Sequence, residues 1–298
     1  MNIVCIGALN WDRKLRLAQA LQPGTSNPVQ QLAGNAGGVA FNLARHLARL
    51  GTEAAQRCRV RLVSAWGDDP EGQSLQHAAQ HAGVELLGLC REGQSSGQYT
   101  AVLQPDGELA LALADMQALQ ELPETFWALA ESAVRRSDAV AIDLNLPAAG
   151  VQRLCVAARS GGTPLALVAV SAPKMAHLPS DLRGVDLLLL NRDELAAVAL
   201  DKELPHSDVL TVWSHLQGRG LRALLLTQGA DGATLCLPDG LHHQTAPRRI
   251  DALDVTGAGD ALSATVLHAW WVQGLPLADA LSQGQRAAAS VLLSLDNA

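Results

Sequence analysis

The residues best suited to chemistry form one short string, DVTGAGDA, over residues 254–261. Gly257 and Gly259 permit backbone angles closed to other residues and let a ligand approach the main chain. An apolar, Ala-rich helical pattern follows at once, so the amides of this loop are expected at a helix N-terminus. Free N–H groups and the helix dipole favour an anion there. Asp260, in the first helical turn, would point toward the bound anion and could accept a proton beside it.

A purely structural explanation of this string competes with the chemical one. Asp is favourable in the first turn of any helix, and Gly-rich turns before helices are common. A G-x-G-D motif by itself therefore carries little information. The string is longer than that, because Asp254 and the hydroxyl of Thr256 precede the two glycines. This combination favours a functional anion site.

A second glycine-rich segment, GNAGGVAFN, covers residues 34–42 and precedes a helical pattern. It can be interpreted as a flexible turn and a helix start that leaves Asn42 exposed. It can also be interpreted as a binding segment, because glycine at position 38 would let a polyol approach the backbone while Asn42 binds its hydroxyls. Both interpretations place the segment at a helix N-terminus.

Polar residues also follow three apolar segments. Asn10 and Asp12 come after the first of these, where open α/β sheets bind ligands, although Asn10 also suits an Asx turn. Asn191 and Glu194, after another of these segments, have the spacing of a helix capping box. The segment TQGADG, residues 227–232, predicts a turn with glycines at positive φ between two strands.

Short apolar segments alternate with longer amphipathic ones, which predicts βαβ units and a mainly parallel sheet covered by helices on both faces. Residues 12–21 and 99–113 break this rhythm and have the mixed polarity of strands or hairpins. We therefore expect a single domain, residues 1–298, with lid strands drawn from about 12–33 and 95–114. The predicted strands of the main sheet are 3–6, 61–65, 139–143, 165–170, 187–190 and 223–227; the predicted helices are 39–50, 72–82, 123–136, 149–160, 193–199, 207–217, 260–273 and 276–294.

The composition excludes several classes of protein. A net charge of -7, no basic cluster and 3% aromatic residues argue against a polynucleotide partner. Five dispersed cysteines without a CxxC pair favour reduced thiols and a cytoplasmic location over disulfides or a sulfur-ligated metal. No apolar run reaches the roughly 18 residues of a membrane span, and the first residues indicate a buried strand, not a secretory signal. A small-molecule enzyme or binding domain is expected.

With these two glycine motifs in this order, the sequence resembles the ribokinase-like (PfkB) family of carbohydrate and nucleoside kinases. Residues 254–261 are similar to the C-terminal signature of that family, and residues 37–51 to its N-terminal signature, with Ala40 where many members carry Gly. The resemblance implies a three-layer α/β/α sandwich with a small β-flap lid and an ATP-dependent kinase. It implies that Asp260 takes the proton of the substrate hydroxyl while the amides of residues 257–259 (Gly257, Ala258 and Gly259) hold the charge of the phosphoryl group.

The resemblance also implies the other sites. Many members of the family dimerise through the flap, so a homodimer is expected by analogy. The substrate sugar would be bound by Asn10, Asp12, Gly38 and Asn42; ATP by Asn191, Thr227, Gly229, Gly232, Gly257 and Gly259; Mg²⁺, through water, by Asn191 and Glu194; and K⁺ by Asp254 and Thr256.

Several segments are similar to those of pseudouridine kinases within this family: GELALALADM at residues 107–116, VSAPK at residues 170–174, and Asn145 where sugar kinases more often carry Glu. The similarity implies phosphorylation of the 5′-hydroxyl of pseudouridine. Asn145 would also reach the ribosyl part, and Asp115 and Met116 would approach the base. Those kinases tend to carry an acidic residue where this chain has Val168 and Ala169, so its duty would pass elsewhere.

Other functions remain open at this point. One alternative is a ribokinase, fructokinase or another nucleoside kinase on the same scaffold. Another is a catalytically silent nucleoside-binding relative, against which the presence of Asp260 argues. A dinucleotide oxidoreductase is excluded, because the first strand is followed by GALN, residues 7–10, and not by G-x-G-x-x-G.

Overall fold

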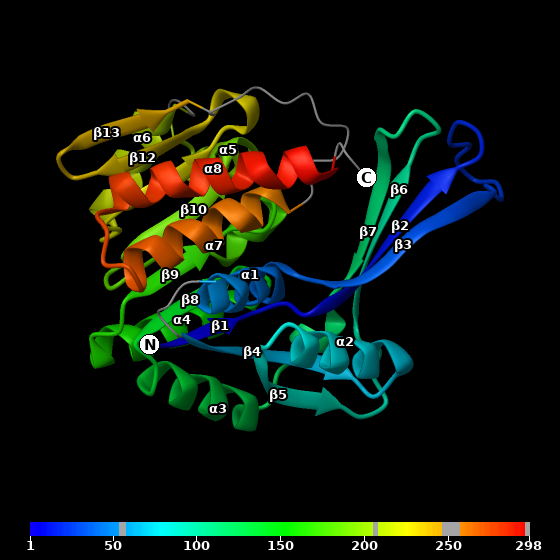
Figure 1. Ribbon diagram of the computed structural model, residues 1–298, viewed down its shortest axis with the longest axis horizontal. Coiled ribbons are helices and arrows are strands. Elements are labelled where there is room, and N and C mark those ends of the chain that lie inside the picture. Colours follow the sequence, from blue (N-terminus) through cyan, green and yellow to red (C-terminus); the bar gives the residue numbers. More distant parts are fainter. Residues whose placement is uncertain (54–57, 205–207, 246–256, 296–298) are drawn as a thin grey trace.

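The protein contains two β-sheets of unequal size (Figure 1). The computed structural model describes residues 1–53, 58–204, 208–245 and 257–295. The larger sheet has the strand order β13-β12-β11-β10-β9-β8-β1-β4-β5, and the smaller has the order β3-β2-β6-β7. Helices cover the large sheet, whereas the small sheet projects to one side of it (Figure 1).

The large sheet is parallel from β5 to β11, and only β12 and β13 run antiparallel to their neighbours. Its central strands read as almost continuous apolar runs because both faces are buried. The carboxyl ends of the parallel strands meet at one edge, where ligands bind in open α/β sheets. The strands are β1 (Asn2–Ile6), β4 (Arg59–Gly67), β5 (Glu85–Arg91), β8 (Ala139–Asp143), β9 (Leu165–Val168), β10 (Leu187–Asn191), β11 (Leu224–Thr227), β12 (Ala233–Leu237) and β13 (Gly240–Gln244).

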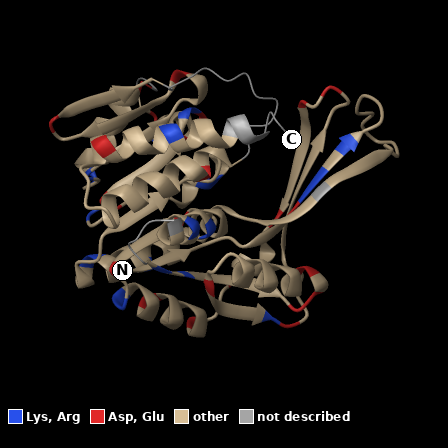
Figure 2. Ribbon diagram, viewed as in Figure 1, with Lys and Arg blue, Asp and Glu red and all other residues tan. Residues whose placement is uncertain are grey.

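The helices divide between the two faces of this sheet, and each face has its own apolar core. One core contains side chains of α3, α4, α5 and α6, and the other contains side chains of α1, α2, α7 and α8. Charged residues lie mainly on the outward sides of the helices and on the lid (Figure 2). The helices are α1 (Val39–Glu53), α2 (Pro70–His81), α3 (Glu124–Arg135), α4 (Ala148–Gly161), α5 (Arg192–Asp201), α6 (Val209–Gly218), α7 (Ala258–Trp271) and α8 (Leu277–Leu295), with 3-10 turns η1 (Gln117–Leu119), η2 (Ala172–His177) and η3 (Gly229–Asp231).

This arrangement confirms the predicted α/β/α sandwich with a mainly parallel sheet. None of the helices within the described ranges has both the length and the apolar character needed to cross a membrane. Four elements were not predicted: β5, β13, η1 and η2. Both strands lie at edges of the sheet, where a strand is only partly covered, so β13 is largely exposed and its sequence, GLHHQ, lacks an apolar pattern.

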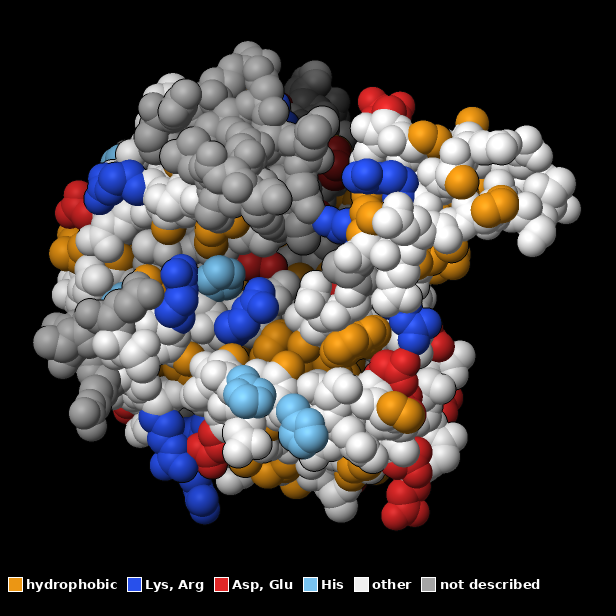
Figure 3. Space-filling view, turned by 45° about the vertical axis from the view of Figure 1, so that its right-hand side comes forward, with side chains coloured by type: hydrophobic (Ala, Val, Ile, Leu, Met, Phe, Trp, Pro, Cys, Tyr) orange, Lys and Arg blue, Asp and Glu red, His pale blue; other side chains and the backbone are white. Residues whose placement is uncertain are grey.

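The small sheet has the position and size of the predicted lid. It consists of β2 (Asn10–Leu17), β3 (Val29–Gly37), β6 (Gly97–Leu103) and β7 (Leu109–Asp115). Of the two interpretations of residues 34–42, the flexible turn does not hold for residues 34–37, because β3 pairs with β2 as far as Gly37 opposite Asn10. Hydrophobic side chains are exposed along the lid (Figure 3), and among them are Val29, Leu32, Leu109 and Leu113.

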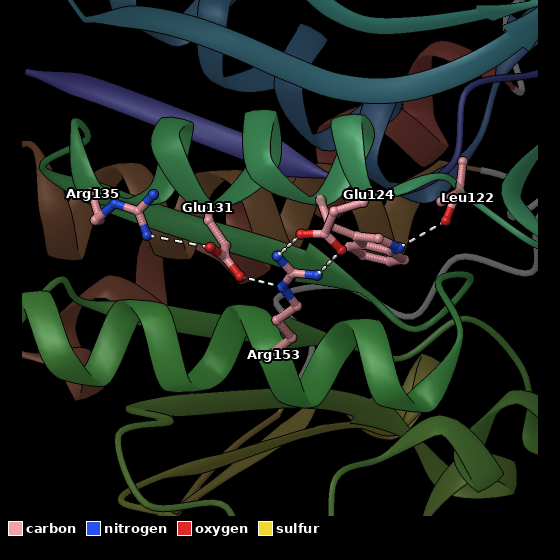
Figure 4. A network of polar contacts seen from close by, with 6 residues as sticks. Leu122, Glu124, Glu131, Arg135 and Arg153 are labelled. Carbon is pink, nitrogen blue, oxygen red and sulfur yellow. Dashed lines mark hydrogen bonds and ion pairs between the residues drawn. The ribbon is translucent and has the colours of Figure 1, made fainter.

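On the opposite side of the molecule, an ion-pair network joins α3 to α4 (Figure 4). The guanidinium of Arg153 binds both carboxylate oxygens of Glu124 and also donates to Glu131, which accepts a second hydrogen bond from Arg135. These contacts lower the pKa of the Glu124 and Glu131 carboxyls. A bidentate Arg–carboxylate pair fixes geometry, so the network holds the Arg153 side chain of α4 against α3.

Candidate active site

Four of the polar residues singled out from the sequence lie at the carboxyl edge of the large sheet. Asn10 follows β1, Asn145 follows β8, Asn191 ends β10 and Thr227 ends β11. Asn191 and Thr227 are register partners on adjacent strands. These two residues therefore occupy neighbouring positions at this edge, and a shared role for all four stays a prediction.

Asp143, the last residue of β8, binds backbone amides of three segments at this edge. Its Oδ2 accepts hydrogen bonds from the backbone amides of Ala8 at 2.9 Å and Ala40 at 3.0 Å, and its Oδ1 accepts one from the amide of Asn145 at 2.9 Å. The carboxylate thus joins the ends of β1 and β8 to the start of α1. Burial raises the pKa of Asp143, and the amides oppose that shift. This role was not predicted from the sequence, in which the only signal is an acidic residue at the end of the apolar run of β8.

Glycines at this edge make room for the carboxylates. A Cβ on Gly7 would collide with the carboxylate of Asp143, and a Cβ on Gly37 would collide with that of Asp12. Gly38 has φ +101°, and a Cβ there would meet the carbonyl oxygen of Ala8. Position 38 therefore requires glycine for reasons of both space and backbone angle, whereas the approach of a polyol to it stays a prediction.

Asn10 and Asp12 form a hydrogen-bonded pair where the lid joins the body. Asn10 is buried, and its Nδ2 donates to Asp12 Oδ1 at 2.5 Å. Burial raises the pKa of Asp12 to about 6, against the hydrogen bond from Asn10 and the charges of Arg45 and Lys14. The two side chains therefore lie together where the lid joins the body, and their binding of a sugar stays a prediction.

The last lid strand, β7, ends close to Asn10. A Cβ on Gly97 would lie 3.1 Å from the Cβ of Asn10 and 3.3 Å from the Sδ of Met116, so Met116 lies across a single glycine from Asn10. Asp115 ends β7, and its Oδ1 accepts a hydrogen bond from the amide of Gln117 at 3.0 Å. Asn145 is buried close by, with its Nδ2 turned toward Asp143 Oδ2 at 3.4 Å.

The two glycine-rich motifs meet through their polar side chains. Asn42 Nδ2 donates to Asp260 Oδ2 at 2.9 Å, although the two residues are 218 positions apart in the chain. Burial raises the pKa of Asp260 to about 6; Asn42 and Arg45 lower it, and Asp12 and Asp143 raise it further. Asp260 therefore faces the sugar-site candidates, as its predicted role requires.

The N-terminus of α7 has the open geometry of an anion site. Gly257 caps the helix with φ 83°, and Ala258, Gly259 and Asp260 form its first turn, whose amides have no acceptor inside the helix. No described residue accepts a hydrogen bond from these three amides. Gly259 has an ordinary helical backbone, so the prediction of unusual angles there was wrong. A Cβ on Gly259 would meet nothing within 4 Å, and the approach of a ligand to this glycine stays a prediction.

The predicted metal residues behave in different ways. Asn191 and Glu194 form a reciprocal capping box, with Glu194 N–H donating to Asn191 Oδ1 at 2.9 Å and Asn191 N–H donating to Glu194 Oε2 at 2.7 Å. Burial raises the pKa of Glu194. Its Oε1 accepts no hydrogen bond from the described residues, and no group of three His, Cys, Asp or Glu side chains in those ranges is placed to hold a metal. Asp254 and Thr256 lie outside the described residues.

The turn after β11 has the predicted glycine geometry. Gly229 has φ +60° and Gly232 has φ +99°, and the amide of Gln228 donates to the carbonyl of Gly232 at 2.8 Å. An ion pair of 2.7 Å between Arg192 and Asp231 connects this turn to the start of α5. The turn therefore lies beside the capping box at the same edge of the sheet.

Comparison with known proteins gives a family and several relatives. The model of the pfkB family carbohydrate kinases matches residues 1–296. The pseudouridine kinase of Escherichia coli (strain K12) is 29% identical over 287 residues, covering 95% of this chain and 88% of the relative. An ATP-dependent ribose-1-phosphate kinase of Halopiger xanaduensis is 27% identical over 279 residues, 92% of this chain and 86% of that protein. The structure of a carbohydrate kinase from Agrobacterium tumefaciens superposes with a TM-score of 0.79 at 32% identity, covering 97% and 89% of the two chains.

Proposed function

We propose that this chain, which belongs to the pfkB carbohydrate kinase family, transfers the γ-phosphoryl group of ATP to the 5′-hydroxyl of pseudouridine. Membership of the family makes it a phosphotransferase that acts on a hydroxyl group of a small molecule. One observation carries the proposal for the site: the hydrogen bond of 2.9 Å between Asn42 and Asp260, which joins the two glycine-rich motifs beside Asp12.

In the proposed reaction, Asp260 is the general base. Its Oδ2 is engaged by Asn42, and its Oδ1 is left to take the proton from the attacking hydroxyl. With a pKa of about 6 the carboxyl is ionised at neutral pH and is still basic enough to accept that proton. The new O–P bond forms as the bond between the γ-phosphorus and the ADP oxygen breaks. The amides of residues 257–259, among them the free amides of Ala258 and Gly259, would hold the charge on the transferred group.

The proposed acceptor pocket lies where lid and body meet. Asn10, Asp12, Gly38 and Asn42 would bind the ribosyl hydroxyls, with Asn145 reaching them through its amide oxygen because its nitrogen is turned toward Asp143. Met116, across Gly97 from Asn10, would pack on the base. Asp115 would accept a hydrogen bond from the N1–H that pseudouridine has and uridine lacks.

The proposed ATP site consists of Thr227, Gly229 and Gly232 together with the N-terminus of α7. Glu194 Oε1 and the exposed Asn191 suit a Mg²⁺ ion held through water, because Mg²⁺ keeps several waters and takes few protein ligands. When bound, the ion would neutralise charge on the phosphates. For K⁺, Asp254 and Thr256 remain our proposal.

Val168 and Ala169 stand where pseudouridine kinases tend to carry an acidic residue, and the neighbouring strand β8 ends in one. Both are buried apolar residues, and neither supplies a carboxylate. Val168 is the register partner of Asp143, whose carboxylate ends β8. We infer that Asp143 takes over the ordering role at this edge.

A homodimer formed through the lid and a cytoplasmic location complete the proposal. The lid carries Val29, Leu32, Leu109 and Leu113 as exposed apolar side chains, which a second copy would cover. All five cysteines are free thiols, which suits a reducing compartment.

A panel of acceptors tests the proposed substrate. With ATP and Mg²⁺, kcat/KM is measured for pseudouridine, uridine, adenosine, ribose, fructose and ribose 1-phosphate. The proposal predicts the highest value for pseudouridine and pseudouridine 5′-phosphate as the product. A higher value for ribose, fructose or ribose 1-phosphate would replace the substrate and leave the family unchanged. Binding of pseudouridine without turnover of any acceptor would favour the silent relative.

A further inference from the structure

Arg45 lies on α1, one turn after Asn42, and it contacts the candidate active site without belonging to either glycine-rich motif. Its Nη2 donates to Asn42 Oδ1 at 3.1 Å. Its guanidinium carbon lies 5.6 Å from the centre of the Phe41 ring, within the range of a cation–π contact. The side chain is exposed, yet two contacts define where its charge is held.

The hydrogen bonds run in one direction, from Arg45 through Asn42 to Asp260. A guanidinium has only donors, so Arg45 selects the oxygen of the Asn42 amide. The nitrogen of that amide must then face Asp260, where it donates to Oδ2 at 2.9 Å. An N–H donor stabilises a carboxylate oxygen that carries no proton.

Resting on the proposed role of Asp260 as the base, we infer that Arg45 is a positioning residue. It locks the Asn42 amide in the orientation that keeps Asp260 ionised, with Oδ1 open to the substrate hydroxyl.

Without Arg45 the Asn42 amide is free to rotate by half a turn. Its oxygen would then face Asp260 and could bond only to a protonated carboxyl, which is the inactive form of a base. Two effects therefore act in the same direction: a hydrogen bond to the charged form is lost, and a positive charge is removed.

The other groups that act on Asp260 increase the need for this arrangement. Burial raises its pKa most strongly, and the negative charges of Asp12 on β2 and Asp143 at the end of β8 add to that effect. Asn42 and Arg45, both on α1, oppose them. Arg45 is thus the positive charge that offsets two neighbouring carboxylates.

The test compares Arg45→Met, Arg45→Gln and Arg45→Lys with Arg49→Met, which removes the same charge one turn further along α1. The dependence of kcat on pH is measured with whichever acceptor the wild type phosphorylates best. For Arg45→Met we expect the acid limb to move up by about one pH unit, which lowers kcat below that limb about tenfold, with little change in either KM. Arg45→Lys should restore most of the profile and Arg45→Gln part of it, because Lys keeps charge and donor whereas Gln keeps a donor only.

A second measurement does not need turnover. In protein labelled with ¹³C at aspartate carboxyls, the Asp260 resonance is assigned by its absence in Asp260→Asn, and its titration midpoint is followed. We expect the midpoint to rise in Arg45→Met and to stay in place in Arg49→Met. The inference would be overturned if Arg45→Met changed neither the titration midpoint of Asp260 nor the acid limb of the kcat profile. It would also be overturned if Arg49→Met shifted them as much as Arg45→Met does. An effect on the KM for ATP alone would make Arg45 a nucleotide contact, which also overturns it. Failure of pseudouridine as a substrate would leave both measurements valid.

Discussion

Two carboxyl groups in the candidate active site, those of Asp12 and Asp260, have a pKa raised to about 6, mainly by burial. Such groups are costly to ionise in a folded protein, and they cluster where a protein binds or transfers protons. The pair therefore marks the site more clearly than either sequence motif does. It also couples the stability of the protein to pH.

The first prediction concerns the stability of Asp260→Asn. A carboxyl whose folded pKa lies above its unfolded value favours the folded state when protonated, so its contribution falls as pH rises from about 3.8 to about 6. Asn removes that penalty and can still accept the hydrogen bond from Asn42. We expect the variant to be more stable than the wild type by about 1 kcal/mol at pH 7.5, a figure discounted for the solvent that reaches this half-buried side chain. The difference in Tm should shrink toward pH 4, and a lower Tm for Asp260→Asn at pH 7.5 would contradict it.

The second prediction concerns the specificity of Asp115→Asn. If the carboxylate accepts the N1–H of pseudouridine, an amide keeps the size of the side chain and weakens that hydrogen bond. We expect the ratio of kcat/KM for pseudouridine over uridine to fall about tenfold, since a hydrogen bond to a charged group is worth about 1.5–3 kcal/mol. Asp106→Asn, at the tip of the same hairpin, is the matched control. An unchanged ratio would remove Asp115 from base recognition.

The chemistry of single residues could be predicted only where residues close in sequence make the pattern. Asp260, Asn42, Asn10 and Asp12 belong to short motifs, and the structure brings them to one place. The role of Asp143 was not predicted, because the amides of Ala40 and Ala8 that it binds lie 103 and 135 positions away in the chain. No local sequence pattern shows such hydrogen bonds.

The start of α5 combines a structural and a chemical role in one segment. The capping box uses the Asn191 side chain and one oxygen of Glu194, as the structural interpretation of the sequence expected. The other oxygen of this buried side chain, Oε1, accepts no hydrogen bond from the described residues and is left for the proposed Mg²⁺ role. Replacing Glu194 by Gln separates helix capping from Mg²⁺ binding, because Gln also completes a capping box but carries no charge.

The third prediction therefore uses Glu194→Gln. We expect the Tm to change little, whereas the Mg²⁺ concentration needed for half-maximal activity should rise about tenfold, as is typical when a group that holds a metal through water is lost. Asp193→Asn removes a neighbouring exposed charge from the same helical turn and should leave the Mg²⁺ dependence unchanged. A normal Mg²⁺ dependence in Glu194→Gln, or an equal effect in both variants, would limit Glu194 to capping.

Helices and central strands of this protein were predictable, whereas its edges were not. Strands such as β1 and β8 are buried on both faces, so their apolar runs stand out in the sequence. The end of β3 consists of residues that suggest a loop, and it is a strand because pairing with β2 overrides local preference.

The lid and the body together make the proposed active site, because Asn10, Asp12 and Met116 come from or adjoin lid strands while Asp260 belongs to α7. The same lid carries an exposed apolar surface that a monomer has no evident use for. Leu113, on β7, is 61% exposed.

The fourth prediction is that Leu113→Glu weakens a lid-mediated dimer. A charge at the centre of an apolar contact must be desolvated when two copies associate. We expect the mass measured by light scattering to shift from dimer toward monomer in this variant. Leu200→Glu, at an 83% exposed position on α5, should behave as the wild type does. A wild-type protein that is monomeric at all concentrations would contradict the proposed dimer.

The three-layer architecture itself followed from the sequence, since the alternation of apolar and amphipathic segments has few physical solutions. The distribution of the helices between the two cores and the pairing of β2 with β6 in the lid did not follow, because both depend on contacts between distant segments.

The central claim is that Asp260 accepts the proton of the acceptor hydroxyl. Its most direct measurement is the turnover of Asp260→Asn together with the Kd for the acceptor and for ATP. A positioned base contributes about 10²–10⁴-fold, so kcat should fall by about that factor while both Kd values stay near those of the wild type. An Asp260→Asn enzyme with unchanged kcat would contradict the account, however well it bound its ligands.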